Sequence, residues 1–185
     1  MKKTLILVAG MPRTGKTTFA NYLTEKLKIT SIYVDKVKEL IWDKTYFEKS
    51  IWLEIQKYGA RNLSLDLACH FCEMLMKSGS SIIFENIWIN ADKLKNMVEK
   101  YDYKVITVLL DGDVEIIHKR FLERENTPER HPSIITNSQF TDLDVFRKAT
   151  QIFRDFNFGN AKIIVDTSDF SKVDYDDILN KIISF

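Results

Sequence analysis

Cysteine is scarce in this chain, and its scarcity excludes two kinds of stabilisation. Among 185 residues there are two cysteines and three histidines. Two thiols cannot build a disulfide framework, and they cannot form a four-ligand zinc site without help from the histidines. Cys69 and Cys72 lie inside an apolar helical pattern, which favours buried core cysteines over a reactive redox pair. We therefore expect a reducing, cytoplasmic environment.

An excess of charge of one sign is also missing. The 27 Lys and Arg residues balance 26 Asp and Glu residues, which leaves a formal net charge of +1. Proteins that coat long nucleic acids usually carry a clear basic excess. We therefore do not expect nucleic acid as a partner, except that a local basic patch for a 5′ end stays open.

Long apolar runs are absent as well. The first run, residues 5–9, follows Lys2 and Lys3 and so imitates the start of a signal peptide, but it ends at Gly10. A membrane-spanning helix needs roughly 20 apolar residues. We interpret residues 4–9 as a buried strand and expect no membrane partner.

The composition that remains is that of a globular protein, with 45% hydrophobic and 29% charged residues. Its length predicts a single domain over residues 1–185. Segments with helical spacing, such as 60–77 and the stretch after Asp174, separate short apolar runs. These runs lie at residues 4–9, 31–34, 81–84, 104–110 and 162–165. Strands that alternate with helices predict an α/β fold with a parallel sheet.

One motif carries the chemistry. Residues 10–17 read Gly-Met-Pro-Arg-Thr-Gly-Lys-Thr and fit the pattern G-x-x-x-x-G-K-S/T. The motif follows the first predicted strand and precedes a helical segment at 18–27, as a phosphate-binding loop requires. Its glycines let backbone N–H groups turn inward, its lysine supplies charge for the outer phosphates, and its last hydroxyl can bind Mg²⁺. The predicted nucleotide site comprises Gly10, Pro12, Arg13, Thr14, Gly15, Lys16, Thr17 and Thr18.

Two classes of nucleotide-binding protein fit poorly. Switch GTPases normally read their base with Asn-Lys-x-Asp, and the Asn180-Lys181 pair is followed by two isoleucines. AAA-type machines add a helical lid domain and are longer than this chain. A compact phosphotransferase remains.

The motif and its setting resemble the small P-loop kinases, in the nucleoside/nucleotide kinase-like family that includes relatives of chloramphenicol phosphotransferase, zeta-toxin kinases and polynucleotide 5′-kinase. The resemblance implies a three-layer fold with a five-stranded parallel sheet of order 2-3-1-4-5 and helices on both faces. It also implies a short lid at about residues 120–140, with ATP and Mg²⁺ as cofactors.

The acceptor side is expected near Asp35, which follows the second predicted strand. The resemblance to the small P-loop kinases implies that an Asp at this place orients the acceptor hydroxyl. The alternative is that Asp35 is the N-cap of a helix that starts at Lys36. Lys38 is a candidate substrate ligand or a solvated lysine. Trp42 and the aromatic residues after it belong either to an acceptor pocket or to the core. Those further aromatic residues are Tyr46, Phe47 and Trp52.

Two carboxylates compete for the metal role. Glu85 ends the third predicted strand and could hold a Mg²⁺-bound water or a substrate hydroxyl. Asp111 ends the fourth predicted strand, where the sequence Asp-Gly-Asp also indicates a turn and a helix cap.

The lid is expected to carry arginines. Arg120 and Arg124 share a helical face, and Arg130 lies in the loop beyond, at residues 125–139, which we expect to be mobile. In related kinases such arginines close over the phosphates; the alternative is a salt-bridged surface helix. His131 is then a hinge residue. Asp166 and Thr167, after the fifth predicted strand, either line the adenine or cap a turn.

The sequence thus predicts an ATP-dependent kinase that transfers the γ-phosphate to a hydroxyl or phosphate of a small molecule. Two alternatives stay open, a polynucleotide 5′-hydroxyl kinase and a regulatory module that binds and slowly hydrolyses ATP. The acceptor, the preference for ATP over GTP and the oligomeric state are not determined by these residues.

Overall fold

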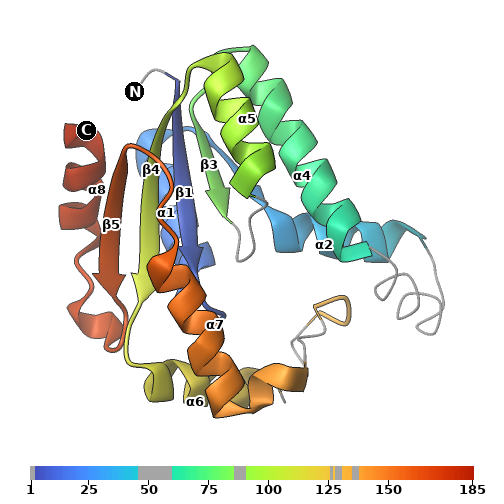
Figure 1. Ribbon diagram of the computed structural model, residues 1–185, viewed down its shortest axis with the longest axis vertical. Helices are drawn as coiled ribbons and strands as arrows, with labels where there is room; N and C mark the ends of the chain where they lie inside the picture. Colours follow the sequence, from blue (N-terminus) through green and yellow to red (C-terminus); the bar gives the residue numbers. More distant parts are fainter. Residues whose placement is uncertain (1–2, 46–59, 86–90, 126, 128–130, 135–137) are drawn as a thin grey trace.

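The computed structural model describes residues 3–45, 60–85, 91–125, 127, 131–134 and 138–185, and its centre is a parallel sheet (Figure 1). The strands are β1 (Thr4–Gly10), β2 (Thr30–Tyr33), β3 (Ile82–Glu85), β4 (Lys104–Asp111) and β5 (Ala161–Asp166). They lie side by side in the order β2-β3-β1-β4-β5. The predicted fold class and strand order are confirmed.

Helices follow or precede every strand. They are α1 (Lys16–Leu27), α2 (Val34–Thr45), α4 (Ala60–Lys77), α5 (Ala91–Tyr101), α6 (Val114–Glu125), α7 (Leu143–Asp155) and α8 (Tyr175–Ser184), with short 3₁₀ turns η1 (Ser138–Thr141) and η2 (Phe170–Lys172). The helix predicted at 60–77 has those bounds. No described helix is long and apolar enough to cross a membrane.

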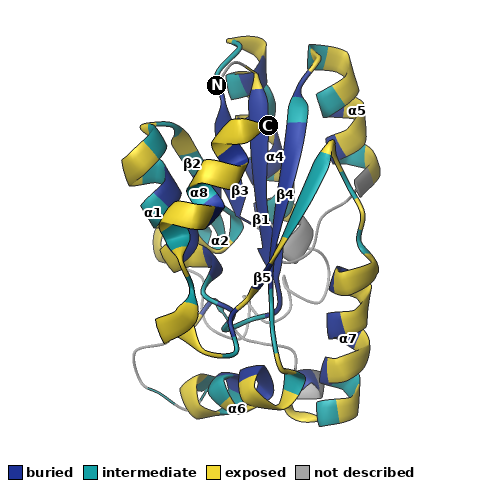
Figure 2. Ribbon diagram, turned by 90° about the vertical axis from the view of Figure 1, so that its left-hand side faces the viewer, coloured by how far each residue is buried: buried dark blue, intermediate teal, exposed yellow. Residues whose placement is uncertain are grey.

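The sheet is covered on both faces because the side chains of its central strand alternate. Leu5 and Leu7 pack with α4 and α5 on one face, while Ile6 and Val8 pack with α1 and α8 on the other. Every residue of β1 is buried (Figure 2). This explains why the strand reads as a continuous apolar run.

A third apolar cluster anchors α6 and α7 at the carboxyl ends of the strands. Phe121 and Phe146 are fully buried there against Ala9 and Leu109. Figure 1 shows α6 running beneath the ends of β1 and β4. The last turn of α6 is thereby brought toward the loop that follows β1.

The two cysteines belong to the α4 side of the core, as predicted. Both are buried free thiols. Burial raises the pKa of Cys69, and it raises that of Cys72 to about 12. A thiol that keeps its proton is a poor nucleophile and a poor metal ligand.

One predicted boundary is wrong. β2 ends at Tyr33 and α2 begins at Val34, so Asp35 lies in the first helical turn. Val34 packs against the core from its place in the helix. A carboxylate in a first turn favours the helix through the helix dipole. The N-cap alternative for Asp35, with a helix starting at Lys36, is therefore excluded.

Candidate phosphate-binding site

The loop between β1 and α1 has a backbone that requires glycine at two places. Gly10 has φ 140°, and a Cβ added there would meet the carbonyl oxygen of Leu110 at 2.2 Å. Gly15 has φ 87°, and its Cβ would meet Phe170 Cε1 at 3.0 Å. The first and last glycines of the motif are therefore fixed by close approach to neighbouring segments.

Polar side chains hold the loop from inside. Thr14 Oγ1 and Lys16 Nζ each donate a hydrogen bond to the carbonyl oxygen of Met11 over 2.9 Å. Thr14 and Lys16 are both buried, whereas Thr17 and Thr18 are exposed in the first turn of α1. Thr17 is thus an exposed residue at the helix N-terminus, which favours anions.

Lys16 shares its surroundings with two carboxylates. Burial lowers the pKa of Lys16, and the negative charges of Glu85 and Asp35 oppose that effect. Burial likewise raises the pKa of Glu85, against the attraction of Lys16 and together with repulsion from Asp35. The charges of Lys16, Glu85 and Asp35, which come from three different elements, therefore act on one another near the phosphate loop.

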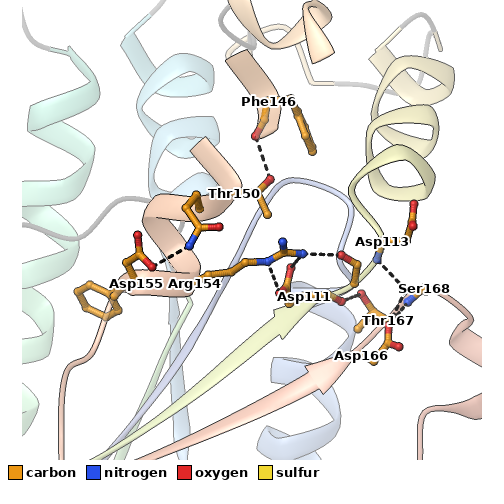
Figure 3. A network of polar contacts seen from close by, with 12 residues as sticks. Asp111, Asp113, Phe146, Thr150, Arg154, Asp155, Asp166, Thr167 and Ser168 are labelled. Atoms are coloured by element: carbon orange, nitrogen blue, oxygen red, sulfur yellow. Dashed lines mark hydrogen bonds and ion pairs between the residues drawn. The ribbon is translucent and has the colours of Figure 1, made fainter. Parts of the chain in front are cut away.

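The two candidates for the metal role are placed differently. Glu85 is 5% exposed and lies beside β1, in register with Val8. Figure 3 shows Arg154 of α7 reaching Asp111, with Nε 2.7 Å from Oδ2 and Nη2 3.1 Å from Oδ1. Asp111 is thus held in an ion pair with α7, and of the two candidates Glu85 is the one whose charge acts on Lys16.

The side chains after β5 stabilise a turn. The backbone N–H of Thr167 and its hydroxyl both donate to the carbonyl oxygen of Asp111, over 2.8 and 2.7 Å. Asp166 Oδ1 accepts from the N–H of Ser168 over 2.8 Å (Figure 3). Asp166 and Thr167 were predicted either to line the adenine or to cap a turn, and these contacts are typical of a turn cap. A base-side role for Asp166 and Thr167 stays a prediction.

Arg120 is joined to that same turn. Its guanidinium donates to the carbonyl oxygens of Thr167 and Ser168 and lies 4.2 Å from the ring centre of Phe170. Arg120 thereby ties α6 to the loop after β5, and its role over the phosphates stays a prediction. Phe170, which also packs against Gly15, was not predicted; its one sequence signal is an aromatic residue just beyond Asp166-Thr167.

The last turn of α6 faces the phosphate loop. Arg13 Nη2 lies 3.9 Å from Glu125 Oε1. Burial and the positive charge of Arg124 lower the pKa of Arg13 to about 10, while Asp35 acts in the opposite direction. Arg124 and Arg13 are therefore close enough to repel each other across the loop. Arg130 lies outside the described residues.

On the acceptor side, α2 contacts the segment that follows α6. Lys38 and Trp42 are half-buried on α2. His131 Nε2 lies 3.1 Å from Asp43 Oδ1, and the His131 ring meets Trp42 edge-on with ring centres 6.5 Å apart. His131 thus links these two segments, while a hinge role for it stays a prediction. The aromatic residues Tyr46, Phe47 and Trp52 lie outside the described residues.

Comparison with known proteins identifies relatives of this arrangement. The chain is 25% identical over 183 residues to L-seryl-tRNA(Sec) kinase of Methanococcus maripaludis, with 97% of this chain and 64% of that protein covered. The chain thus spans less than two thirds of that relative.

Solved structures share the fold over the whole chain. A candidate kinase from Chloroflexus aurantiacus superposes with a TM-score of 0.82 at 19% identity, covering 100% of this chain and 98% of the other. Shikimate kinase from Bacteroides thetaiotaomicron gives 0.64 at 15% identity, covering 98% and 99%. At these identities the likeness establishes the fold and nothing finer.

A family model described as AAA domain matches residues 6–143, which include the phosphate loop, Glu85 and the helix that carries Arg120 and Arg124. The chain length argued against an AAA-type machine, and the solved structures matched above are those of compact kinases. The chain belongs to this AAA-domain family, AAA_18, and has the fold of the P-loop kinases.

Proposed function

We propose that this protein is an ATP-dependent phosphotransferase that moves the γ-phosphate of ATP to a small acceptor. The observation that carries the proposal is a phosphate loop whose buried Lys16 feels the charges of Glu85, buried at the end of the neighbouring strand, and of Asp35. A buried cation suits the phosphates, and the two carboxylates near it suit a metal ion and an acceptor. Phosphoryl transfer needs mainly positioning and charge stabilisation of this kind.

Mg²⁺ is the metal that these residues fit. The Thr17 hydroxyl and the Glu85 carboxylate offer oxygen ligands, which Mg²⁺ prefers, and it usually takes only one or two carboxylates besides phosphate oxygens and water. Within the described part of the chain, no three His, Cys, Asp or Glu side chains form a ready metal cage. The ion would therefore be held jointly with the nucleotide, and it would neutralise charge on the β- and γ-phosphates.

For a hydroxyl acceptor, Asp35 would act as the positioning base. The acceptor oxygen forms a bond to the γ-phosphorus, the bond from that phosphorus to the β–γ bridging oxygen breaks, and the hydroxyl proton passes to the Asp35 carboxylate. Asp35 is exposed, so its carboxylate is accessible to an acceptor. Lys16 and the amides of the loop would hold the β- and γ-phosphates throughout.

The first prediction concerns Lys16. Lys16→Ala removes the buried ammonium group and should weaken Mg-ATP binding in calorimetry at least about tenfold, because charge-assisted hydrogen bonds contribute roughly 1.5–3 kcal/mol. Lys26→Ala, which removes an exposed lysine from the same helix outside the predicted site, is the matched control for local disturbance. Unchanged binding in Lys16→Ala would exclude the proposed site.

An acceptor screen distinguishes the remaining possibilities. Purified protein is incubated with γ-labelled ATP and Mg²⁺ together with nucleosides, sugars, hydroxy acids, antibiotics, oligonucleotides and seryl-tRNA. A labelled small molecule supports the proposal. A labelled oligonucleotide 5′ end indicates a polynucleotide kinase, and ATP hydrolysis with no labelled acceptor indicates a regulatory module. Seryl-tRNA is included because the relative named above is a kinase of seryl-tRNA.

A further inference from the structure

Arg13 has a backbone conformation that its residue type disfavours. Its φ is 73°, in the left-handed region, where an added side chain normally makes the conformation unfavourable by roughly 1–2 kcal/mol. It occupies the fourth position of the phosphate loop, between Pro12 and Thr14, where a glycine would adopt the same φ without strain. Strained residues persist at functional loops when the side chain has a function there. The position of the Arg13 side chain is therefore informative.

Within the described part of the chain, the guanidinium of Arg13 has a donor without an acceptor. Its side chain is 20% exposed, and its Nε atom is buried with no hydrogen-bond partner among the described residues. Nη2 lies 3.9 Å from Glu125 Oε1, which is an ion-pair distance but too long for a hydrogen bond. Burying a charged donor without a partner is unfavourable.

The charges around Arg13 are of the same sign on two sides. Arg124, at the end of α6, repels it, and Arg13 in turn repels the buried Lys16. The negative charge of Asp35 offsets part of this repulsion. Arg13, whose Nε has no hydrogen-bond partner among the described residues, thus lies near two other cations at one loop, and a polyanion would complete this site.

We propose that the Arg13 side chain binds the triphosphate of the nucleotide and acts as a catalytic arginine supplied by the phosphate loop itself. This rests on the proposed function. In the nucleotide complex the guanidinium exchanges its long contact with Glu125 for direct hydrogen bonds to phosphate oxygens. As the γ-phosphoryl group moves to the acceptor oxygen, negative charge builds on the oxygen left on ADP, and Arg13 stabilises it without forming a covalent bond.

Glu125 has a defined part in this exchange. Its carboxylate lies at ion-pair distance from the Arg13 guanidinium, with Oε1 3.9 Å from Nη2. It therefore competes with the incoming phosphates for the same cation. A carboxylate that only stabilised the fold would not influence triphosphate affinity in this direction.

The deciding experiment compares Arg13 variants in calorimetry with Mg-ATP and with inorganic tripolyphosphate. Arg13→Gly and Arg13→Asn, which both tolerate a left-handed φ, should bind either ligand about 10- to 100-fold more weakly and lower kcat similarly. Arg13→Lys should recover part of both. AMP affinity should change less, since AMP has no β- or γ-phosphate. Thermal stability of Arg13→Gly should be equal to or above that of the wild type, because strain is removed.

Two controls separate function from structure. Lys28→Gly changes another left-handed residue, the C-cap of α1 with φ 56°, and should leave both affinities unchanged. Glu125→Gln should tighten tripolyphosphate binding several-fold. The inference is overturned if the wild type binds in a Lys16-dependent way while Arg13→Gly and Arg13→Asn bind and turn over as the wild type does. If the wild type itself binds neither ligand, the proposed function is wrong, and the inference that rests on it is wrong as well.

Discussion

The carbonyl of Leu110 makes Gly10 irreplaceable in a way that its φ alone does not. Gly10→Ala would place a Cβ 2.2 Å from that oxygen, so β1 and β4 would have to separate. We expect a loss of about 3 kcal/mol in the free energy of unfolding and no Mg-ATP binding. Urea denaturation and calorimetry measure the two effects.

Gly79 supplies the matched control for Gly10. It also has a positive φ, 73°, but an added Cβ would meet nothing within 4 Å. Gly79→Ala should therefore lower stability by only about 1 kcal/mol and leave nucleotide binding intact. Equal losses in both variants would contradict a steric role for Leu110.

At the scale of elements, we expect the carboxylates at the ends of β3 and β4 to have separate tasks. Asp111→Asn weakens the ion pair that holds α7 to β4, so it should reduce stability by about 1 kcal/mol and leave Mg²⁺-dependent turnover near the wild-type value. Glu85→Gln should lower that turnover at least about tenfold. Denaturation curves and Mg²⁺ titrations of both variants provide the measurement.

Arg154→Ala tests whether Asp111 stabilises the fold through its ion pair with Arg154. If Asp111 acts through Arg154, the double variant Asp111→Asn/Arg154→Ala should be little less stable than Arg154→Ala alone. Losses that simply add would show that the pair does not couple α7 to β4. A loss of turnover in Asp111→Asn would return Asp111 to the metal site.

The helix α4 makes a prediction about pH. Burial holds the pKa of Cys72 at about 12, above its ordinary value, so the folded protein keeps a proton that the unfolded chain releases first. The stability that this thiol contributes is therefore complete below the ordinary thiol pKa and is lost as pH rises toward 12. The difference in unfolding free energy between wild type and Cys72→Ala should shrink above about pH 9. A difference that stays constant to pH 11 would refute this.

At the scale of the whole molecule, the features that could be predicted from the sequence are those that depend on residues close together in the chain. Buried strands and the phosphate loop follow from apolar runs and from the spacing of Gly10, Gly15 and Lys16. The contacts of Arg120 could not be predicted, because its partners lie after β5 and come near only when the sheet has formed. The choice between Glu85 and Asp111 likewise depended on α7, which delivers Arg154 to one of them. The end of the second strand was predicted one residue too late, at Val34, since short strands and first helical turns share β-branched residues.

The order of the strands has a consequence for synthesis on the ribosome. β1 is made first, yet both of its neighbours come much later, because Leu5 pairs with Ile82 and Val105. A nascent chain must therefore carry an unpaired and mostly apolar strand while most of the domain is still untranslated. Such non-local parallel pairing folds slowly and leaves apolar segments open to aggregation. The segment at greatest risk during translation is thus the one that leads directly into the phosphate loop.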